Sequence, residues 1–238
     1  MFRPTKLSPL EILLLVFTST IVVTGVVISR INVQWFEEVY AVEDGFVENW
    51  TLVPLLFATI YALYQVASHG RYKTWHFNVL MLLVALFSFF VAGEEISWGQ
   101  RVFDVQSSEF FKQHNSQAET NLHNMVVGDK KINKIVFSQL LTGGIAFYLL
   151  VLPLLYSKKT GVKSFVDKVG LPIAQLYQIA ACLLLFGSIL FIPSGKNAEI
   201  LEAGITTLFL LIFLFPQNAW VFEKEQHLIA AKQKAGAV

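Results

Sequence analysis

The chain has 238 residues, of which 55% are hydrophobic and only 15% are charged, and its formal net charge is +1. A soluble domain would be about 45–50% apolar and about 25% charged, so this composition excludes an ordinary soluble globular protein. No basic stripe interleaved with aromatic residues is present, so we expect no nucleic-acid partner.

Six apolar segments approach or reach the roughly 20 residues that a helix needs to cross a bilayer. In chain order they run from Leu10 to Ser29, Asn49 to Ser68, Phe77 to Gly93, Ile135 to Tyr156, Leu171 to Ile192 and Ile200 to Phe222. The sequence therefore predicts an all-α polytopic membrane protein with about six transmembrane helices. We expect one membrane domain over residues 1–222 and a short cytoplasmic tail over residues 223–238.

Local signals mark some of these segments. Ser8-Pro9-Leu10-Glu11 predicts a helix start, with a capping residue, a proline in the first turn and an acid at the third position. The segment that follows is longer than the 7–15 residues of a signal-peptide core, so we expect a retained helix. Gly143-Gly144 predicts a close helix approach, and Pro216 predicts a kink.

The basic residues of the short loops predict the orientation. Lys and Arg are enriched in cytoplasmic loops, and the loops His69–His76 and Ser157–Gly170 are both basic. We therefore expect both termini in the cytoplasm. Four acids then fall on the cytoplasmic side: Glu11, Asp167, Glu223 and Glu225. The other 13 of the 17 acids lie outside, an excess that the orientation rule does not explain.

The outer segment before the second helix contains Glu43-Asp44-Gly45 and Glu48. Asp44 is expected to cap that helix and Glu48 to lie in its first turn, where the helix dipole favours an acid. Glu199 and Glu202 start the sixth helix, one turn apart. Glu202 lies just inside the apolar segment, and acids at membrane depth are candidates for function because burying their charge is costly.

The richest polar stretch is Gly93-Glu94-Glu95-Ile96-Ser97-Trp98-Gly99-Gln100-Arg101. Because the apolar run before it is short, we expect the third helix to continue through Glu94 and Glu95, where the helix dipole disfavours acids. That placement suggests a partner such as Arg101, a cation or a shared proton. If the helix continues further, Glu94, Trp98 and Arg101 lie on one face.

A second polar stretch, residues 115–124, contains Glu119 and His123 four residues apart. In a helix these side chains would stack as a carboxylate–imidazole pair, which suits a divalent metal ion or a histidine held in one tautomer. A catalytic zinc normally has three protein ligands, so Glu94 or Glu95 would have to complete the site. One divalent metal ion held by Glu94, Glu95, Glu119 and His123 is therefore expected as a cofactor.

These two stretches resemble a bacterial family of polytopic membrane proteins with the pattern GEEISWGQR…NxQxExNLHN. An acidic E-D-G-x-x-E element precedes the second helix of that family, and residues 43–48 match it. The resemblance covers residues 40 to 125 and implies the architecture, a shared site and the bacterial inner membrane, but no particular activity. A fainter similarity is to alkaline ceramidases, whose zinc site uses several later histidines. This chain departs from them, since only His227 follows His123.

The leading hypothesis from the sequence is a membrane enzyme acting on a lipid or lipid-linked substrate. Glu94, Glu95, Glu119 and His123 would bind the metal ion or perform acid–base chemistry. The expected substrate-binding residues are Trp98, Arg101, Asn121, Asn124, Asp44, Glu48 and Glu202.

Two alternatives stay open. One is a cation channel or transporter with an acidic outer vestibule, although the middle of the helices is nearly free of ionisable residues. The other is a non-catalytic subunit that docks a partner protein. Membrane lipids, a second copy of the chain and another membrane protein are the partners expected.

Overall fold

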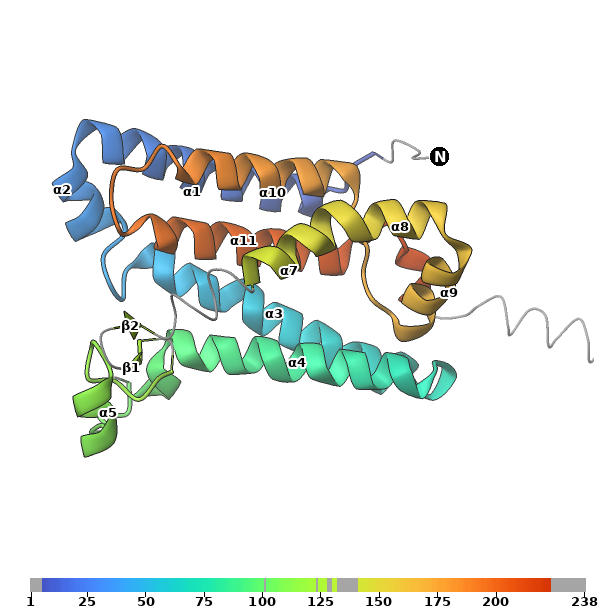
Figure 1. Cartoon of the computed structure of the whole chain (residues 1–238), viewed down its shortest axis with the longest axis horizontal. Coiled ribbons are helices and arrows are strands. Elements are labelled where there is room, and N and C mark those ends of the chain that lie inside the picture. The colour runs from blue at the N-terminus through green and yellow to red at the C-terminus, as the bar shows by residue number, and fades with distance from the viewer. Residues whose placement is uncertain (1–5, 101, 123, 128–129, 132–140, 224–238) are drawn as a thin grey trace, which may run out of the picture.

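The computed structural model describes residues 6–100, 102–122, 124–127, 130–131 and 141–223. Six helical runs lie side by side along its long axis (Figure 1). They are α1 (Pro9–Ile31), α3 (Phe46–His69), α4 (Trp75–Glu95), the run α7 (Leu141–Ala146), η5 (Phe147–Val151) and α8 (Leu152–Lys158), then α10 (Leu176–Ile189) and α11 (Asn197–Leu214).

Short elements lie at the two ends of this bundle. One end carries α2 (Val33–Trp35), η1 (Phe36–Tyr40), η3 (Ser97–Gly99), α5 (Glu109–His114) and the two-residue strands β1 (Val126–Val127) and β2 (Lys130–Lys131). We call it the ribbon end. The other carries η2 (Gly70–Tyr72), α9 (Thr160–Val169) and η6 (Ala219–Val221), and we call it the α9 end.

Four helices in the described part of the chain are long and apolar enough to cross a membrane: Pro9–Ile31, Phe46–Tyr72, Trp75–Glu95 and Asn197–Leu214. The run Gly143–Lys158 with Thr160–Val169 makes a fifth if this pair, bent by 117°, is one span. The remaining run, α10, is a shorter apolar helix. The structure thus has the four or five long apolar helices that a polytopic membrane protein requires. The predicted fourth segment begins in residues that lie outside the described ones.

Apolar side chains on the bundle surface and polar side chains between the helices follow the distribution expected of a protein surrounded by lipid. Large aliphatic residues such as Leu86 and Leu184 are 65% and 71% exposed on the bundle surface. Polar residues such as Gln65, Ser88 and Gln178 are buried between helices. An aqueous solvent would favour the reverse, whereas hydrocarbon accepts the aliphatic surface and excludes the amides.

The predicted helix 171–192 is longer than α10 at both ends, and the predicted helix 200–222 runs past the end of α11. Helix α10 begins only at Leu176, because the segment before it is extended and pairs with residues beyond α11. Ile173 N donates to Asn218 Oδ1 at 3.0 Å, and Gln217 N donates to the Ile173 carbonyl at 2.7 Å. Helix α11 ends at Leu214 rather than bending, since a residue before a proline, here Phe215, is disfavoured in helical geometry.

The predicted start of the first helix is confirmed. Ser8 Oγ accepts from Glu11 N at 3.2 Å, and Ser8 N donates to Glu11 Oε2 at 2.7 Å, which is a capping box. The other Glu11 oxygen accepts a hydrogen bond from the Tyr177 hydroxyl. This carboxylate therefore ties the start of α1 to the start of α10.

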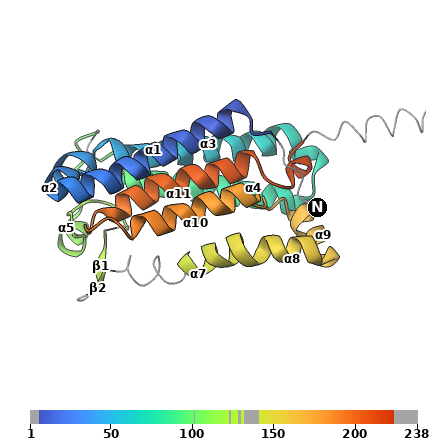
Figure 2. The same ribbon diagram turned by 90° about the horizontal axis from the view of Figure 1, so that it is seen from above.

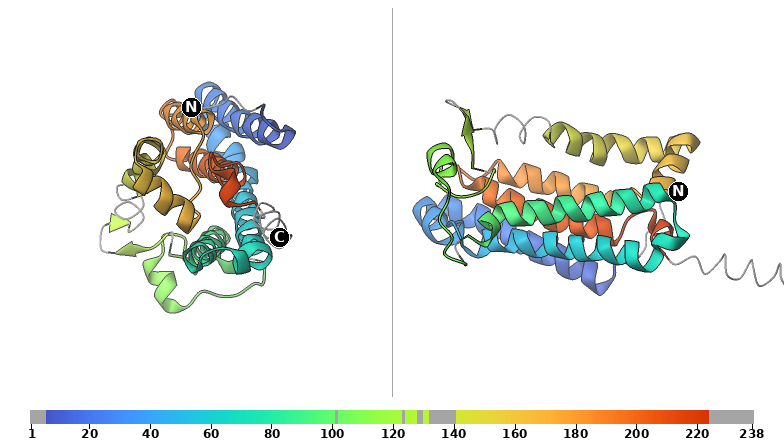
Figure 3. Two further views of the ribbon diagram at one scale, coloured as in Figure 1. Left: turned by 90° about the vertical axis from the view of Figure 1, so that its right-hand side faces the viewer. Right: turned by 90° about the horizontal axis from the view of Figure 1, so that it is seen from below.

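The run α7–α8 lies at the edge of the bundle (Figures 2 and 3). A π-helical turn, η5, interrupts it just before Pro153, whose missing N–H and bulky ring disturb an α-helical ladder. The close approach predicted at Gly143-Gly144 is not made within the described residues, since nothing lies within 4 Å of a Cβ built at either glycine.

Gly170 ends α9 with a φ of 77°, and a Cβ placed there would lie 2.2 Å from Phe77 Cδ2. We expect Gly170→Ala to lower the free energy of unfolding by at least about 2 kcal/mol, because it adds left-handed strain to a steric clash. Thermal unfolding in detergent, followed by circular dichroism, measures this. Gly161→Ala, on the same helix with open space around it, is the matched control and should keep stability or raise it by up to about 1 kcal/mol, because alanine favours the helix.

Candidate functional site

Four glutamates from three helices gather at the ribbon end. Glu48 lies on α3, Glu95 on α4, and Glu199 and Glu202 on α11, and α3 packs against both other helices. All four are partly buried. The charges of Glu95, Glu199 and Glu48 act on Glu202, and those of Glu199 and Glu48 act on Glu95. We call these four residues the carboxylate cluster.

Helix ends explain how the chain holds so many like charges together. Glu48 and Glu199 lie in the first turns of α3 and α11, where the positive end of the helix dipole favours a carboxylate. Glu95 ends α4, where the dipole is unfavourable, as the sequence predicted. Glu95 nevertheless lies close enough to Glu48 and Glu199, in the first turns of α3 and α11, for their charges to act on it.

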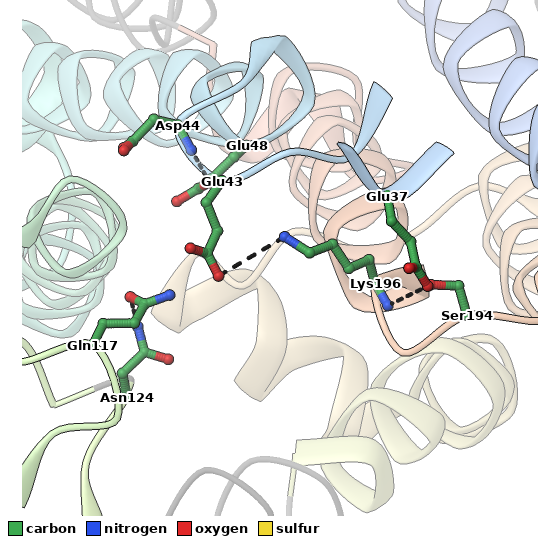
Figure 4. A network of polar contacts seen from close by, with 8 residues as sticks. All are labelled: Glu37, Glu43, Asp44, Glu48, Gln117, Asn124, Ser194 and Lys196. Atoms are coloured by element: carbon green, nitrogen blue, oxygen red, sulfur yellow. Dashed lines mark hydrogen bonds and ion pairs between the residues drawn. The ribbon is translucent and has the colours of Figure 1, made fainter. Parts of the chain in front are cut away.

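Lys196, drawn beside Glu43 in Figure 4, adds a positive charge close to the cluster. Its Nζ lies 3.8 Å from Glu43 Oε1, and its charge also acts on Glu48 and Glu199. Beside it, Ser194 Oγ donates to Glu37 Oε1 at 2.6 Å, so the loop before α11 is fastened to η1. Lys196 therefore lies near the cluster on the side that also holds the loop acids Glu43 and Glu37.

The entry to α3 differs in detail from the prediction. Gly45 is the N-cap residue, so the expected side-chain capping by Asp44 is wrong. Glu48 instead reaches back and accepts from the Asp44 N–H at 2.6 Å, with Asp44 at a φ of 60° (Figure 4). The predicted place of Glu48 in the first turn is confirmed, and this contact fixes its carboxylate at the mouth of the cluster.

Glu94, the neighbour of Glu95, has a different role. It is buried, and it accepts hydrogen bonds from Trp98 Nε1 at 2.8 Å and from Leu122 N at 2.5 Å. The indole ring covers Gly93, where a Cβ would lie 2.8 Å from it. Gly93 is therefore needed for Trp98 to fold back onto α4.

The third helix ends at Glu95, as the sequence predicted, and does not continue further toward Arg101. Ser97, Trp98 and Gly99 all have positive φ, 47°, 56° and 73°, so the chain makes a left-handed turn. Glu94 and Trp98 still meet, but through this turn rather than along a helix face. Arg101, the third predicted member of that face, lies outside the described residues.

Residues 115–122 form turns rather than a helix, so the predicted helical stacking of Glu119 with the residue four positions later is wrong. Glu119 Oε2 accepts from Ser97 Oγ at 2.5 Å. Gln100 Oε1 accepts from Thr120 N at 2.8 Å. His123 lies outside the described residues.

Asn121 joins these two stretches, and we call their contact the loop interlock. It is 3% exposed, and its Nδ2 donates to Ser97 Oγ at 2.8 Å. Its Oδ1 accepts from Asn115 Nδ2 at 2.8 Å and from Asn124 N at 3.0 Å. Asn124 Nδ2 in turn donates to Gln117 Oε1 at 2.6 Å (Figure 4). Both predicted substrate-binding asparagines thus hold the loop together.

Three of the four predicted metal ligands, Glu94, Glu95 and Glu119, lie within the described residues, and His123 does not. Glu94 and Glu119 accept hydrogen bonds within the loop interlock, and their charges also act on Glu95 and Glu48 of the carboxylate cluster. No group of three His, Cys, Asp or Glu side chains among the described residues is placed to hold a metal ion. Of the predicted site residues, Glu48, Glu95 and Glu202 join the carboxylate cluster, whereas Glu94 contacts Trp98 and Glu119 contacts Asn121.

Sequence reasoning missed Lys196 and gave Glu199 no role. The signal was present, because Lys196 and Glu199 are three residues apart in the turn that starts α11, one turn before Glu202. Two acids to which the sequence assigned no contact also have one: Glu43 lies 3.8 Å from Lys196 Nζ, and Glu37 accepts from Ser194 Oγ.

No protein-family model, curated protein or solved structure matches this chain. The family resemblance of the two polar stretches therefore stays a prediction. Function must be argued from the geometry at the ribbon end.

Replacing Asn121 tests the loop interlock. We expect Asn121→Ala to lower the free energy of unfolding by about 2–4 kcal/mol, because it leaves buried partners unsatisfied. Gln113→Ala on the exposed face of α5 is the control, and its effect should stay within about 0.5 kcal/mol. Chemical unfolding in detergent compares them. An unchanged free energy of unfolding in Asn121→Ala would show that Asn121 does not stabilise the loop interlock.

Proposed function

We propose that the protein is a membrane-embedded enzyme that performs acid–base chemistry on a lipid or lipid-linked substrate, with the carboxylate cluster as its site. The observation that carries this proposal is the meeting of Glu48, Glu95, Glu199 and Glu202 at three helix ends. The predicted quartet of Glu94, Glu95, Glu119 and His123 is replaced by this set.

The proposed chemistry uses Glu95 and Glu202 as a pair. Two carboxyl groups whose like charges repel in a partly buried site are suited to hold one proton between them. The ionised member would take a proton from an attacking water or hydroxyl group. The protonated member would give its proton to the oxygen of the leaving group, so that protons balance over the reaction.

The surroundings favour an amphiphilic substrate. Lys196 at the rim supplies a charge for an anionic group such as a phosphate. Close to the end of α4, Phe89, Trp98 and Phe103 expose aromatic surface, with the Trp98 ring edge-on to Phe89. Aromatic side chains at a bilayer boundary accommodate acyl chains on one side and polar groups on the other. A lipid-linked substrate has a polar group that suits Lys196 and an acyl chain that suits the aromatic surface.

Cation passage is the second candidate, favoured by buried polar side chains along α3 and α4. Thr51, Ser88 and Gln65 are buried, and His69 Nδ1 lies 2.9 Å from Gln65 Oε1 toward the α9 end. Buried apolar residues, Ala62, Met81 and Ala85, lie in the same two helices. Because these apolar residues interrupt a polar path, the geometry supports the enzyme better.

The enzyme proposal predicts activity that depends on the pair. Purified protein would be incubated in vesicles of total bacterial lipid, and new products would be detected by mass spectrometry. We expect Glu95→Gln and Glu202→Gln each to lower the rate about 10²–10⁴-fold, because each removes one proton-transfer group. Glu38→Gln, at an exposed position in η1, should leave the rate unchanged.

Thermal unfolding of the same variants separates chemistry from folding, since the glutamine side chains keep the shape of the glutamates. Product formation that survives both substitutions would overturn the proposal. Absence of products in wild-type protein, together with cation flux that Glu202→Gln abolishes, would establish the second candidate instead.

A further inference from the structure

Helix α9 crosses the α9 end of the bundle and is bent by 117° from the run that precedes it. Its inward face is packed, because Val166 is 1% exposed and belongs to a cluster with Leu152, Tyr156 and Ile173. Thr74 Oγ1 donates to the Lys168 carbonyl at 2.7 Å and fastens the helix to the start of α4. The position of α9 is therefore set by the protein itself.

The outward side of this region is positively charged. Its exposed lysines are Lys158, Lys159, Lys163 and Lys168. The acid in the same stretch, Asp167, accepts from the Tyr156 hydroxyl at 2.9 Å and from Asn218 Nδ2 at 3.3 Å. Within the described ranges none of the four ammonium groups is paired with a carboxylate. We call these lysines the α9 basic face.

Apolar groups lie among these charges. Phe165 is 63% exposed between Lys163 and Lys168, and Trp220 is 51% exposed. Lys163 Nζ lies 5.5 Å from the centroid of the Trp220 ring and 5.7 Å from that of Tyr156. Lysines beside exposed aromatic rings are typical of the headgroup layer, where ring and stem meet acyl chains and the ammonium group meets phosphate.

We propose that the α9 basic face binds the headgroups of anionic phospholipids. If the run Gly143–Lys158 crosses the bilayer, a helix bent by 117° from it lies close to the bilayer plane, at the depth of the phosphates. Four unpaired lysines complement a negative lipid surface, and Phe165 enters the acyl region. This inference does not use the carboxylate cluster, which lies at the opposite end of the bundle.

Native mass spectrometry of the full chain in detergent tests this, with phosphatidylglycerol and phosphatidylcholine added in equal amounts. Wild-type protein should retain phosphatidylglycerol preferentially. Replacing all four lysines by glutamine should lower that preference about tenfold or more, because each lysine near an anionic surface adds several-fold in affinity. Replacing all four by arginine keeps the charge and should keep the preference. Lys112→Gln, at the ribbon end and paired with Glu109, should have no effect.

Circular dichroism and the unfolding temperature verify that the glutamine variant is folded. A folded glutamine variant that retains phosphatidylglycerol as wild-type does would overturn the proposal, as would equal retention of both lipids by wild-type protein. Displacement of phosphatidylglycerol by millimolar inorganic phosphate would also overturn it, because the face would then be a site for free anions rather than for lipid.

Discussion

The hydrogen bonds to Glu94 connect the membrane bundle to the loops that cover it. Its two carboxylate oxygens accept from the Trp98 indole and the Leu122 backbone, and so hold the loop interlock against the end of α4. Successive helical residues point about 100° apart. With Glu94 held toward the loops, Glu95 is left to join the carboxylate cluster. One hydrogen-bonded glutamate thereby orients its neighbour, and the proposed chemistry depends on that division of roles.

The positions of the helix ends also determine the electrostatic environment of the carboxylate cluster. Two helices begin and one ends where the cluster forms, so the partial positive charges of α3 and α11 face the acids that would otherwise destabilise the end of α4. Lys196 contributes at the rim only. The fold thus places the positive ends of two helix dipoles at the site where the four carboxyl groups meet.

The sequence predicted what periodicity and apolar length determine: a helical membrane architecture, the start of α1 at Ser8, and the end of α4 at Glu95. The predictions from sequence failed where contacts between distant segments, rather than local backbone preferences, determine the structure. The left-handed turn at Ser97–Gly99 depends on Asn121 and Glu119, some two dozen residues away. Convergence of Glu48, Glu95 and Glu202 depends on how α3, α4 and α11 pack, which spacing within one segment does not encode.

The extended segment before α10 has a consequence for biogenesis. Ile173 satisfies its backbone N–H and carbonyl with residues 218 and 217, which follow α11. Those partners emerge from the ribosome only after 45 further residues have been made. Until then the polar backbone of this stretch needs water, since hydrocarbon offers it no partner. The contacts that hold the segment before α10 can therefore form only once α11 and the residues after it have been made.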